Sequence, residues 1–284
     1  MRIRNTRYAI RERITPMTYL TFHLIFLFPP LLALAVMQPR PLAGQGGPRA
    51  RWGLPLICLI AFAYTTPWDN FLVHQGIWSY GPERVWTTVG YVPVEEYAFF
   101  ILQTLLTGLF LYWLLARARA AHAADAHEKP AGAFTHPVAH RAGAAGFLTL
   151  SVLGAALLVS GWERGRYAGL ILAWAGPVLT LLWAFGGNVA WALRGVFVPA
   201  VLVPTVYLWC ADAVALRLGV WHIARETSLG VGVLGLPVEE AAFFLVTNLM
   251  VVLGLLLFLF SERAAGHRFI QRLSAPISSP PERA

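Results

Sequence analysis

Long apolar runs separated by short polar segments dominate the chain. Seven of these runs have the roughly 17–25 residues that an α-helix needs to cross the hydrocarbon core of a bilayer. They occupy residues 19–37, 52–68, 94–116, 144–160, 167–185, 196–216 and 238–260. The pattern predicts an all-α fold, a polytopic membrane helix bundle of about seven transmembrane helices.

A polar motif stands at the start of two of these runs. The sequence Pro-Val-Glu-Glu begins at Pro93 and again at Pro237, and a Phe-Phe pair follows both copies at the same spacing. Proline is tolerated at a helix start because its missing N–H would have no intrahelical partner there, and the helix dipole favours carboxylates in the first turn. Each copy therefore predicts a helix whose first turn holds two glutamates at the edge of the hydrocarbon. Solvated helix caps are the alternative interpretation of these glutamates.

The repeat extends beyond the glutamates. Asp69 lies nine residues before Trp78, and Asp212 lies nine residues before Trp221, with a glycine two residues before each Trp. The second and third spans are thus equivalent to the sixth and seventh, with four helices from each span to its equivalent. An even number of membrane crossings brings the chain back to the same side of the bilayer, so equivalent spans run in the same direction. We therefore expect two parallel homologous repeats, related by a pseudo-two-fold axis along the membrane normal. This arrangement puts the acidic residues of both repeats on one side of the bilayer.

The pattern also predicts how the chain is divided. We expect a first repeat of three helices at 1–116, a polar linker at 117–143, a linking helix at 144–160, a second repeat of three helices at 161–262 and a mobile tail at 263–284.

Composition supports an integral membrane protein. Hydrophobic residues make up 57% of the chain and charged residues 13%, against about 25% charged residues in soluble domains. The formal net charge is +8. The arginines gather at the N-terminus and in the loops, which is typical of contact with anionic lipid headgroups. Their scatter around apolar spans speaks against nucleic acid as a partner.

Helical geometry separates the two glutamates of each copy. Seven residues make nearly two turns, so Glu96 lies above Gln103 and Glu240 lies above Thr247. These polar stripes predict that Glu96 and Glu240 face the interior of the bundle. The preceding glutamate of each copy is turned by about 100°, so we expect it at a helix interface or towards the headgroups.

Ionisable groups at membrane depth are costly and usually functional, and a buried carboxyl group can act as a general acid near neutral pH. The candidate catalytic residues are Glu96, Glu240, Glu95, Glu239, Asp69 and Asp212. Loss of Glu96 or Glu240 is expected to impair the chemistry most. Helix capping is the alternative role for the two aspartates.

Aromatic residues crowd the same region, where they predict a π-lined cavity that can stabilise a cation. The candidate substrate-binding residues are Trp78, Trp221, Phe99, Phe100, Phe243 and Phe244, together with Gln103 and Thr247. An interfacial aromatic belt is the alternative interpretation for most aromatic residues near the polar loops, but Trp78 and Trp221 repeat.

Motifs that the chain lacks narrow the chemistry further. The segment Gly44-Gln45-Gly46-Gly47 follows no strand and fails as a dinucleotide fingerprint, and there is no Walker, Cys-x-x-Cys or His-Glu-x-x-His motif. No pair of aspartates stands at helical spacing to hold Mg²⁺ and a diphosphate. We therefore expect neither a cofactor nor a metal.

With these residues laid out, the chain resembles the small membrane lycopene cyclase family, the heterodimeric-type carotenoid cyclases whose two homologous domains are separate subunits or one fused chain. The doubled Pro-Val-Glu-Glu motif with its Phe-Phe pair carries the resemblance, and the Asp…Gly-x-Trp pattern supports it. This chain looks like the fused form. The match to Trp78-Ser79-Tyr80 is better than the match to Trp221-His222-Ile223, which leaves open whether both halves catalyse.

The resemblance implies a reaction and its partners. It implies a carotenoid cyclase that closes the linear ends of lycopene into β-rings by carboxylic-acid protonation, cyclisation of the cation and deprotonation, without net redox change. The implied partners are lycopene or a related linear carotenoid, membrane lipid and other carotenoid-pathway enzymes, in a prokaryotic cell membrane. Two other classes stay open, a proton-coupled transporter and a noncatalytic carotenoid- or lipid-binding protein.

Overall fold

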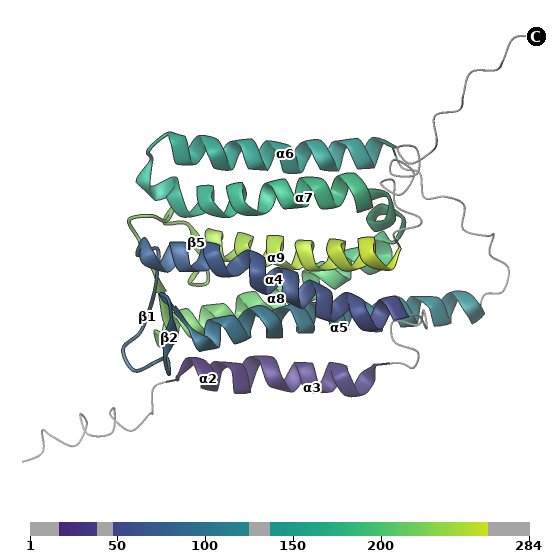
Figure 1. Ribbon diagram of the computed structural model, residues 1–284, viewed down its shortest axis with the longest axis horizontal. Helices are drawn as coiled ribbons and strands as arrows, with labels where there is room; N and C mark the ends of the chain where they lie inside the picture. Colours follow the sequence, from purple (N-terminus) through teal and green to yellow (C-terminus); the bar gives the residue numbers. More distant parts are fainter. Residues whose placement is uncertain (1–16, 39–47, 125–136, 261–284) are drawn as a thin grey trace, which may run out of the picture.

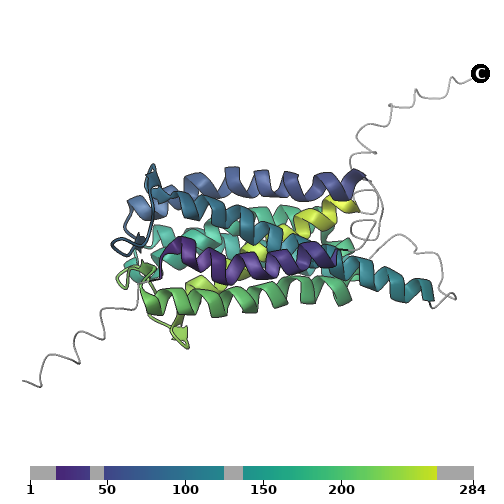
Figure 2. The same cartoon turned by 90° about the horizontal axis from the view of Figure 1, so that it is seen from below.

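The computed structural model describes residues 17–38, 48–124 and 137–260. Within them, seven helices are long and apolar enough to cross a membrane, and they run side by side in both views (Figures 1 and 2). They are the composite first span of α2, η1 and α3 (Tyr19–Phe22, His23–Leu27 and Phe28–Met37), α4 (Pro48–His74), α5 (Val94–Ala124), α6 (Pro137–Val159), α7 (Arg166–Ala192, after the short 3-10 helix η3 at Glu163–Gly165), α8 (Arg194–Leu218) and α9 (Val238–Leu259). The predicted all-α membrane bundle is confirmed. The predicted mobile tail, 263–284, lies outside the described residues.

Two helices extend beyond their predicted spans into the predicted linker. α5 continues to Ala124 and α6 begins at Pro137, whereas the linker was predicted over 117–143. α4, α7 and α8 are also longer than predicted. The extension of α5 is rich in alanine and arginine, which favour helix, and proline is well suited to the first position of α6. α6 packs at the edge of the bundle against α7 (Figure 1). Glycine allows this close approach, since a Cβ at Gly176 would lie 2.4 Å from the hydroxyl oxygen of Ser151.

A π-helical segment, η1, interrupts the first span just before Pro29 and Pro30. Pro30 has no N–H to donate to the carbonyl of Phe26, four residues earlier. The hydroxyl of Tyr207 on α8 donates to that carbonyl at 2.7 Å and replaces the missing backbone bond. A side chain from the second half of the chain thus satisfies the carbonyl that the break in the first span leaves free.

This contact has a counterpart on the other side of the bundle. Tyr64 of α4 donates its hydroxyl to the carbonyl of Trp174 in α7 at 2.8 Å. Tyr64 and Tyr207 each lie five residues before the aspartate of their repeat, Asp69 or Asp212. α4 therefore contacts α7 as α8 contacts the first span, which is the arrangement expected of parallel repeats.

Short strands join the repeats at one end of the bundle. β1 (Trp78–Tyr80) pairs antiparallel with β4 (Trp221–Ile223), and Ser79 lies opposite His222. Trp78 faces Ile223 while Tyr80 faces Trp221, so exchanging the two halves leaves the pairing unchanged. The pseudo-two-fold axis therefore passes through this strand pair, where the sequence predicts only loops.

A tight hairpin leads into each glutamate-bearing helix. β2 (Thr88–Val89) and β3 (Val92–Pro93) precede α5, and β5 (Gly232–Val233) and β6 (Leu236–Pro237) precede α9. Gly90 and Gly235, in the two turns, have φ values of 67° and 87°, which only glycine adopts without strain. Each hairpin ends in the proline that begins the repeated motif, so it fixes where the helix starts.

Polar side chains join the halves within the bundle. Gln103 of α5 donates to Thr247 of α9 at 2.8 Å, and Thr107 donates to Asn248 at 2.7 Å. Asn248 in turn donates to Thr205 of α8 at 2.9 Å. Because Asn248, Thr107 and Thr205 are fully buried, these bonds tie three helices together in a region without water to replace them.

Candidate active site

Glu96 and Glu240 lie in the first turns of α5 and α9, at the end of the bundle that carries β1 and β4. Both are buried, and both line one small cavity of about 30 Å³. We call it the acid cavity; it is lined by Tyr19, Trp78, Glu96, Phe99, Asp212, Trp221, Ile223, Glu240, Phe243 and Phe244. The two glutamates that the helical stripes turn inward therefore share one site, built from both repeats.

A phenol bonds each of these glutamates. Tyr19, the first residue of the first span, donates to Oε2 of Glu96 at 2.7 Å. Tyr167, in the first turn of α7, donates to Oε1 of Glu240 at 2.5 Å. The backbone N–H of each tyrosine is also bonded to a loop, Tyr19 to the carbonyl of Arg84 and Tyr167 to that of Thr227. Sequence reasoning missed both tyrosines, although they open equivalent spans and each begins a predicted apolar run.

The first repeat adds a second phenol. Tyr80 of β1 donates to the same Oε2 of Glu96 at 3.1 Å. Burial, with a contribution from the nearby Glu96 carboxyl group, raises the pKa of Tyr80 well above its ordinary value, so this phenol stays protonated as a donor. Its counterpart in β4 is Ile223, which has no donor to offer. Glu96 and Glu240 thus have different surroundings within a symmetric frame.

The aspartates also differ between the halves. Trp221 donates its indole N–H to Oδ1 of Asp212 at 2.8 Å. Both oxygens of Asp69 are buried and have no hydrogen-bond partner among the described residues, and the same is true of the indole N–H of Trp78. Asp212 lines the acid cavity and Asp69 is buried at the equivalent position of α4. Two more carboxyl groups therefore surround the site.

Glu95 and Glu239 have a different environment. Glu95 accepts the backbone N–H of Trp86 at 2.7 Å. Glu239 accepts the backbone N–H of Leu229 at 2.6 Å and the hydroxyl of Ser228 at 3.1 Å. Neither glutamate is among the residues that line the acid cavity. Their contacts fix the loops that precede α5 and α9.

The candidate aromatic residues divide between two cavities. Trp78, Trp221, Phe99, Phe243 and Phe244 line the acid cavity. The remaining candidates, Phe100, Gln103 and Thr247, line a second cavity of about 220 Å³ between α4, α5, α7 and α9, which we call the apolar cavity. Phe243 lines both.

This arrangement offers a defined chemistry. Buried carboxyl groups held by phenols can donate and accept protons, and the faces of Trp and Phe side chains can stabilise a cation between these steps. Among the described residues, no group of three His, Cys, Asp or Glu side chains is placed to hold a metal ion. The site is suited to acid–base chemistry on an apolar molecule.

Comparisons with known proteins agree with this chemistry. A family model described as Lycopene cyclase matches residues 16–115 and 166–272. A lycopene beta-cyclase from Halobacterium salinarum is 41% identical over 242 residues, which are 85% of this chain and 95% of the relative. Bifunctional lycopene cyclase/phytoene synthases from Arthroderma gypseum and Phycomyces blakesleeanus are 36% and 35% identical, over 84% and 83% of this chain and 40% and 38% of those proteins. No solved structure matches the chain.

Proposed function

The chain belongs to the lycopene cyclase family, and from this premise we propose that Glu96 and Glu240 perform the acid and base steps of the lycopene β-cyclisation that it catalyses. The substrate is a linear carotenoid and the enzyme is an integral membrane protein. The observation that carries the assignment is that both carboxyl groups face one aromatic cavity.

The reaction needs one proton in and one proton out. One glutamate, as a carboxylic acid, protonates C2 of the terminal double bond, which leaves a tertiary cation at C1. The C5=C6 double bond attacks C1, so that a C1–C6 bond closes the ring and the positive charge moves to C5. The other glutamate, as a carboxylate, removes the proton from C6, and the electrons of that C–H bond re-form C5=C6. The product is an isomer of the substrate.

The surroundings suit this sequence of charges. The cation that passes from C1 to C5 is stabilised by aromatic faces and by nearby carboxylate. Trp78 and Phe243 meet edge to face with ring centroids 5.5 Å apart and supply part of that lining. We assign Asp212 and Asp69 to electrostatic support, and Glu95 and Glu239 to holding the loops that precede α5 and α9.

We assign a first repeat to 1–116 and a second to 161–262, joined by the linker and α6; the two matched stretches support this division. The relative from Halobacterium salinarum favours a prokaryotic cell membrane. Lipid surrounds the bundle, and other carotenoid-pathway enzymes deliver the linear substrate into the same membrane.

The test uses Glu96→Gln, Glu240→Gln and the double variant in cells that accumulate lycopene. Glutamine keeps the size and hydrogen-bonding capacity but cannot act as a Brønsted acid. We expect each single variant to lose at least about 10²-fold of cyclised product per folded protein. Glu96→Gln should be the more severe, because Glu96 accepts two phenols and Glu240 accepts one. Near-wild-type turnover in the double variant would move the acid to another carboxyl group.

Pigment analysis of these cells, together with a proton-flux assay on vesicles that contain the protein, separates the other two classes. A noncatalytic carotenoid-binding protein would retain lycopene unchanged, and a transporter would carry protons across vesicles without changing the pigment.

A further inference from the structure

The apolar cavity is unlike the acid cavity in its chemistry. Its wall is almost entirely hydrocarbon, and most of its polar side chains are bonded within the protein. The indole N–H of Trp174 is an exception, since it has no hydrogen-bond partner among the described residues. Gln103 donates to Thr247, Thr104 donates to the carbonyl of Phe100, and Thr247 donates to the carbonyl of Phe243. The cavity therefore offers little hydrogen-bonding capacity to an occupant, and it suits a hydrocarbon rather than a headgroup or a polar metabolite.

The cavity extends into the membrane from the acid end. Along α9 its lining runs from Phe243 to Gly254, a rise of about 16 Å at 1.5 Å per residue. On α4 it runs from Thr65 back to Ile57, in the same direction because α4 ends where α9 begins. The cavity thus spans about half of the ~30 Å hydrocarbon core, with Phe243 at the end next to the glutamates.

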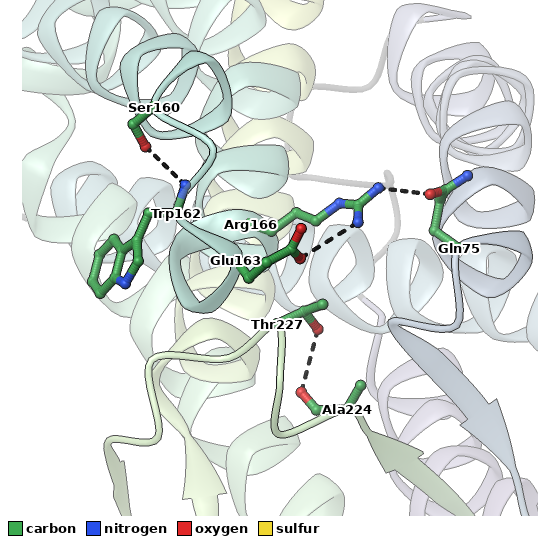
Figure 3. Close-up of polar contacts among 7 residues, drawn as sticks. All are labelled: Gln75, Ser160, Trp162, Glu163, Arg166, Ala224 and Thr227. Carbon is green, nitrogen blue, oxygen red and sulfur yellow. Dashed lines mark hydrogen bonds and ion pairs between the residues drawn. The ribbon is translucent and has the colours of Figure 1, made fainter.

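Its side opens between α4 and α7. The lining residues of α5 are buried, whereas Ile60 and Tyr64 of α4 are exposed and Val178 and Leu182 of α7 are half-buried. At the loop end this gap is closed. Arg166 donates to the side chain of Gln75 at 2.6 Å, across from the end of α4 to the start of α7 (Figure 3).

Aromatic side chains close the gap further in. Trp174 of α7 stacks on Trp68 of α4 with ring centroids 4.5 Å apart, and Trp68 stacks on Phe243 at 5.7 Å. The hydroxyl of Tyr64 bonds the carbonyl of Trp174 at the same level. Beyond these contacts the gap between α4 and α7 leads from the apolar cavity to the lipid-facing side of the bundle.

We infer that the apolar cavity is the binding site for the polyene chain of the carotenoid, which reaches it sideways from the bilayer between α4 and α7. This inference rests on the proposed function. A linear C40 hydrocarbon is about as long as the bilayer is thick, ~30 Å, so only one end and the adjoining part of the chain fit. That end passes Phe243 to reach Glu96 and Glu240, while the remainder stays in the lipid.

The pseudo-two-fold axis supplies matched controls. Ile60, at the α4 side of the opening, lies nine residues before Asp69, and Val203 of α8 lies nine residues before Asp212. Both are about half exposed, at 50% and 52%. Leu182 on the α7 side lies fifteen residues after Tyr167, as Leu34 lies fifteen residues after Tyr19. A bulky side chain at Ile60 or Leu182 would obstruct the opening, and one at Val203 or Leu34 would face the equivalent region of the other half.

The experiment measures cyclisation kinetics and lycopene retention in Ile60→Trp, Leu182→Trp, Val203→Trp and Leu34→Trp. We expect Ile60→Trp and Leu182→Trp to lower kcat/KM at least about tenfold, mainly through KM, the size of effect that one misfitting group has in an apolar pocket. The two control variants should stay within about twofold of the parent. The thermal unfolding midpoint of each purified variant tests whether it is folded. If Ile60→Trp or Leu182→Trp fails to accumulate, the other variant at the opening still provides the test.

Binding is measured separately from chemistry. Lycopene that co-purifies with Glu96→Gln/Glu240→Gln should fall at least about tenfold when Ile60→Trp is added, and should not change with Val203→Trp. If the wild type retains lycopene but does not cyclise it, the proposed function fails while the binding site stands. Unchanged KM and retention in both obstructed variants would overturn the inference, as would equal losses in the controls. If the apolar cavity binds an ordinary lipid acyl chain instead of the carotenoid, KM and lycopene retention should also stay unchanged in Ile60→Trp and Leu182→Trp.

Discussion

Removing the phenolic hydroxyl of Tyr167 tests whether the tyrosines act through the glutamates. Tyr167→Phe deletes one hydroxyl, and with it the only phenol among the described residues that donates to Glu240. Tyr19→Phe and Tyr80→Phe each leave Glu96 with one of its two phenols. We therefore expect Tyr167→Phe to have the largest effect and Tyr80→Phe the smallest, since Tyr80 makes the longer bond of the pair on Glu96.

The size of the effect follows from the bond. A hydrogen bond to a charged group contributes about 1.5–3 kcal/mol, and each 1.36 kcal/mol is tenfold in rate. Tyr167→Phe should therefore lower kcat by about 10- to 150-fold. KM should change little, because the hydroxyl contacts the glutamate rather than the polyene chain.

The assay is a double-mutant cycle on cyclised product per folded protein. In the Glu240→Gln background, Tyr167→Phe should cost little more, because the group that the phenol positions is already disabled. Tyr207→Phe is the control, since it also loses one hydroxyl but bonds a backbone carbonyl of the first span. It should affect stability by about 0.5–1.5 kcal/mol and leave kcat unchanged. If the losses from Tyr167→Phe and Glu240→Gln multiply, the tyrosine does not act through Glu240.

Three further outcomes can be measured on the same purified protein. Asn248→Leu removes the buried side chain that bonds the hydroxyls of Thr107 and Thr205. It should destabilise the protein by about 1–3 kcal/mol, measured as a lower unfolding midpoint in detergent. An unchanged midpoint would contradict a stabilising role for these bonds. Glu239→Ala removes the acceptor for the hydroxyl of Ser228 and the backbone N–H of Leu229, so less protein should accumulate. Its kcat per folded molecule should stay within about tenfold of the wild-type value, far above the kcat of Glu240→Gln. A kcat as low as that of Glu240→Gln would make Glu239 a catalytic residue. Activity should persist after removal of flavin, nicotinamide and divalent metal, because the proposed steps move only protons; an obligate requirement for reduced flavin would contradict them.

The membrane spans could be predicted because each is a long apolar run, and the hydrocarbon core sets its length. The inward position of Glu96 and Glu240 was accessible for a similar reason, since residues seven apart share a helix face. The repeat also carried information, because equal spacings to Trp78 and Trp221 indicated two similar halves. These are all local or periodic features, which a single sequence contains.

Contacts between segments far apart in the sequence could not be predicted from such patterns. Tyr19 lies 77 residues from Glu96 and Tyr167 lies 73 residues from Glu240, and no periodic pattern connects them. The strand pair at Ser79 and His222 was missed because three residues are too few to show an alternating pattern. Closer attention to what begins each equivalent span would have found the tyrosines, since both predicted runs start with one.

Because both glutamates line one cavity, a proton removed by one glutamate stays close to the other. In the proposed mechanism, each ring closure leaves the acid deprotonated and the base protonated. Since the polyene reaches the cavity from one side, the next molecule needs the proton back on the original acid. Tyr19, Tyr80, Tyr167 and Asp212 lie next to the two glutamates. A hydrogen taken from C6 of one carotenoid can therefore become the hydrogen on C2 of the next, and in heavy water the rings keep protium to the degree that internal return outpaces exchange with solvent.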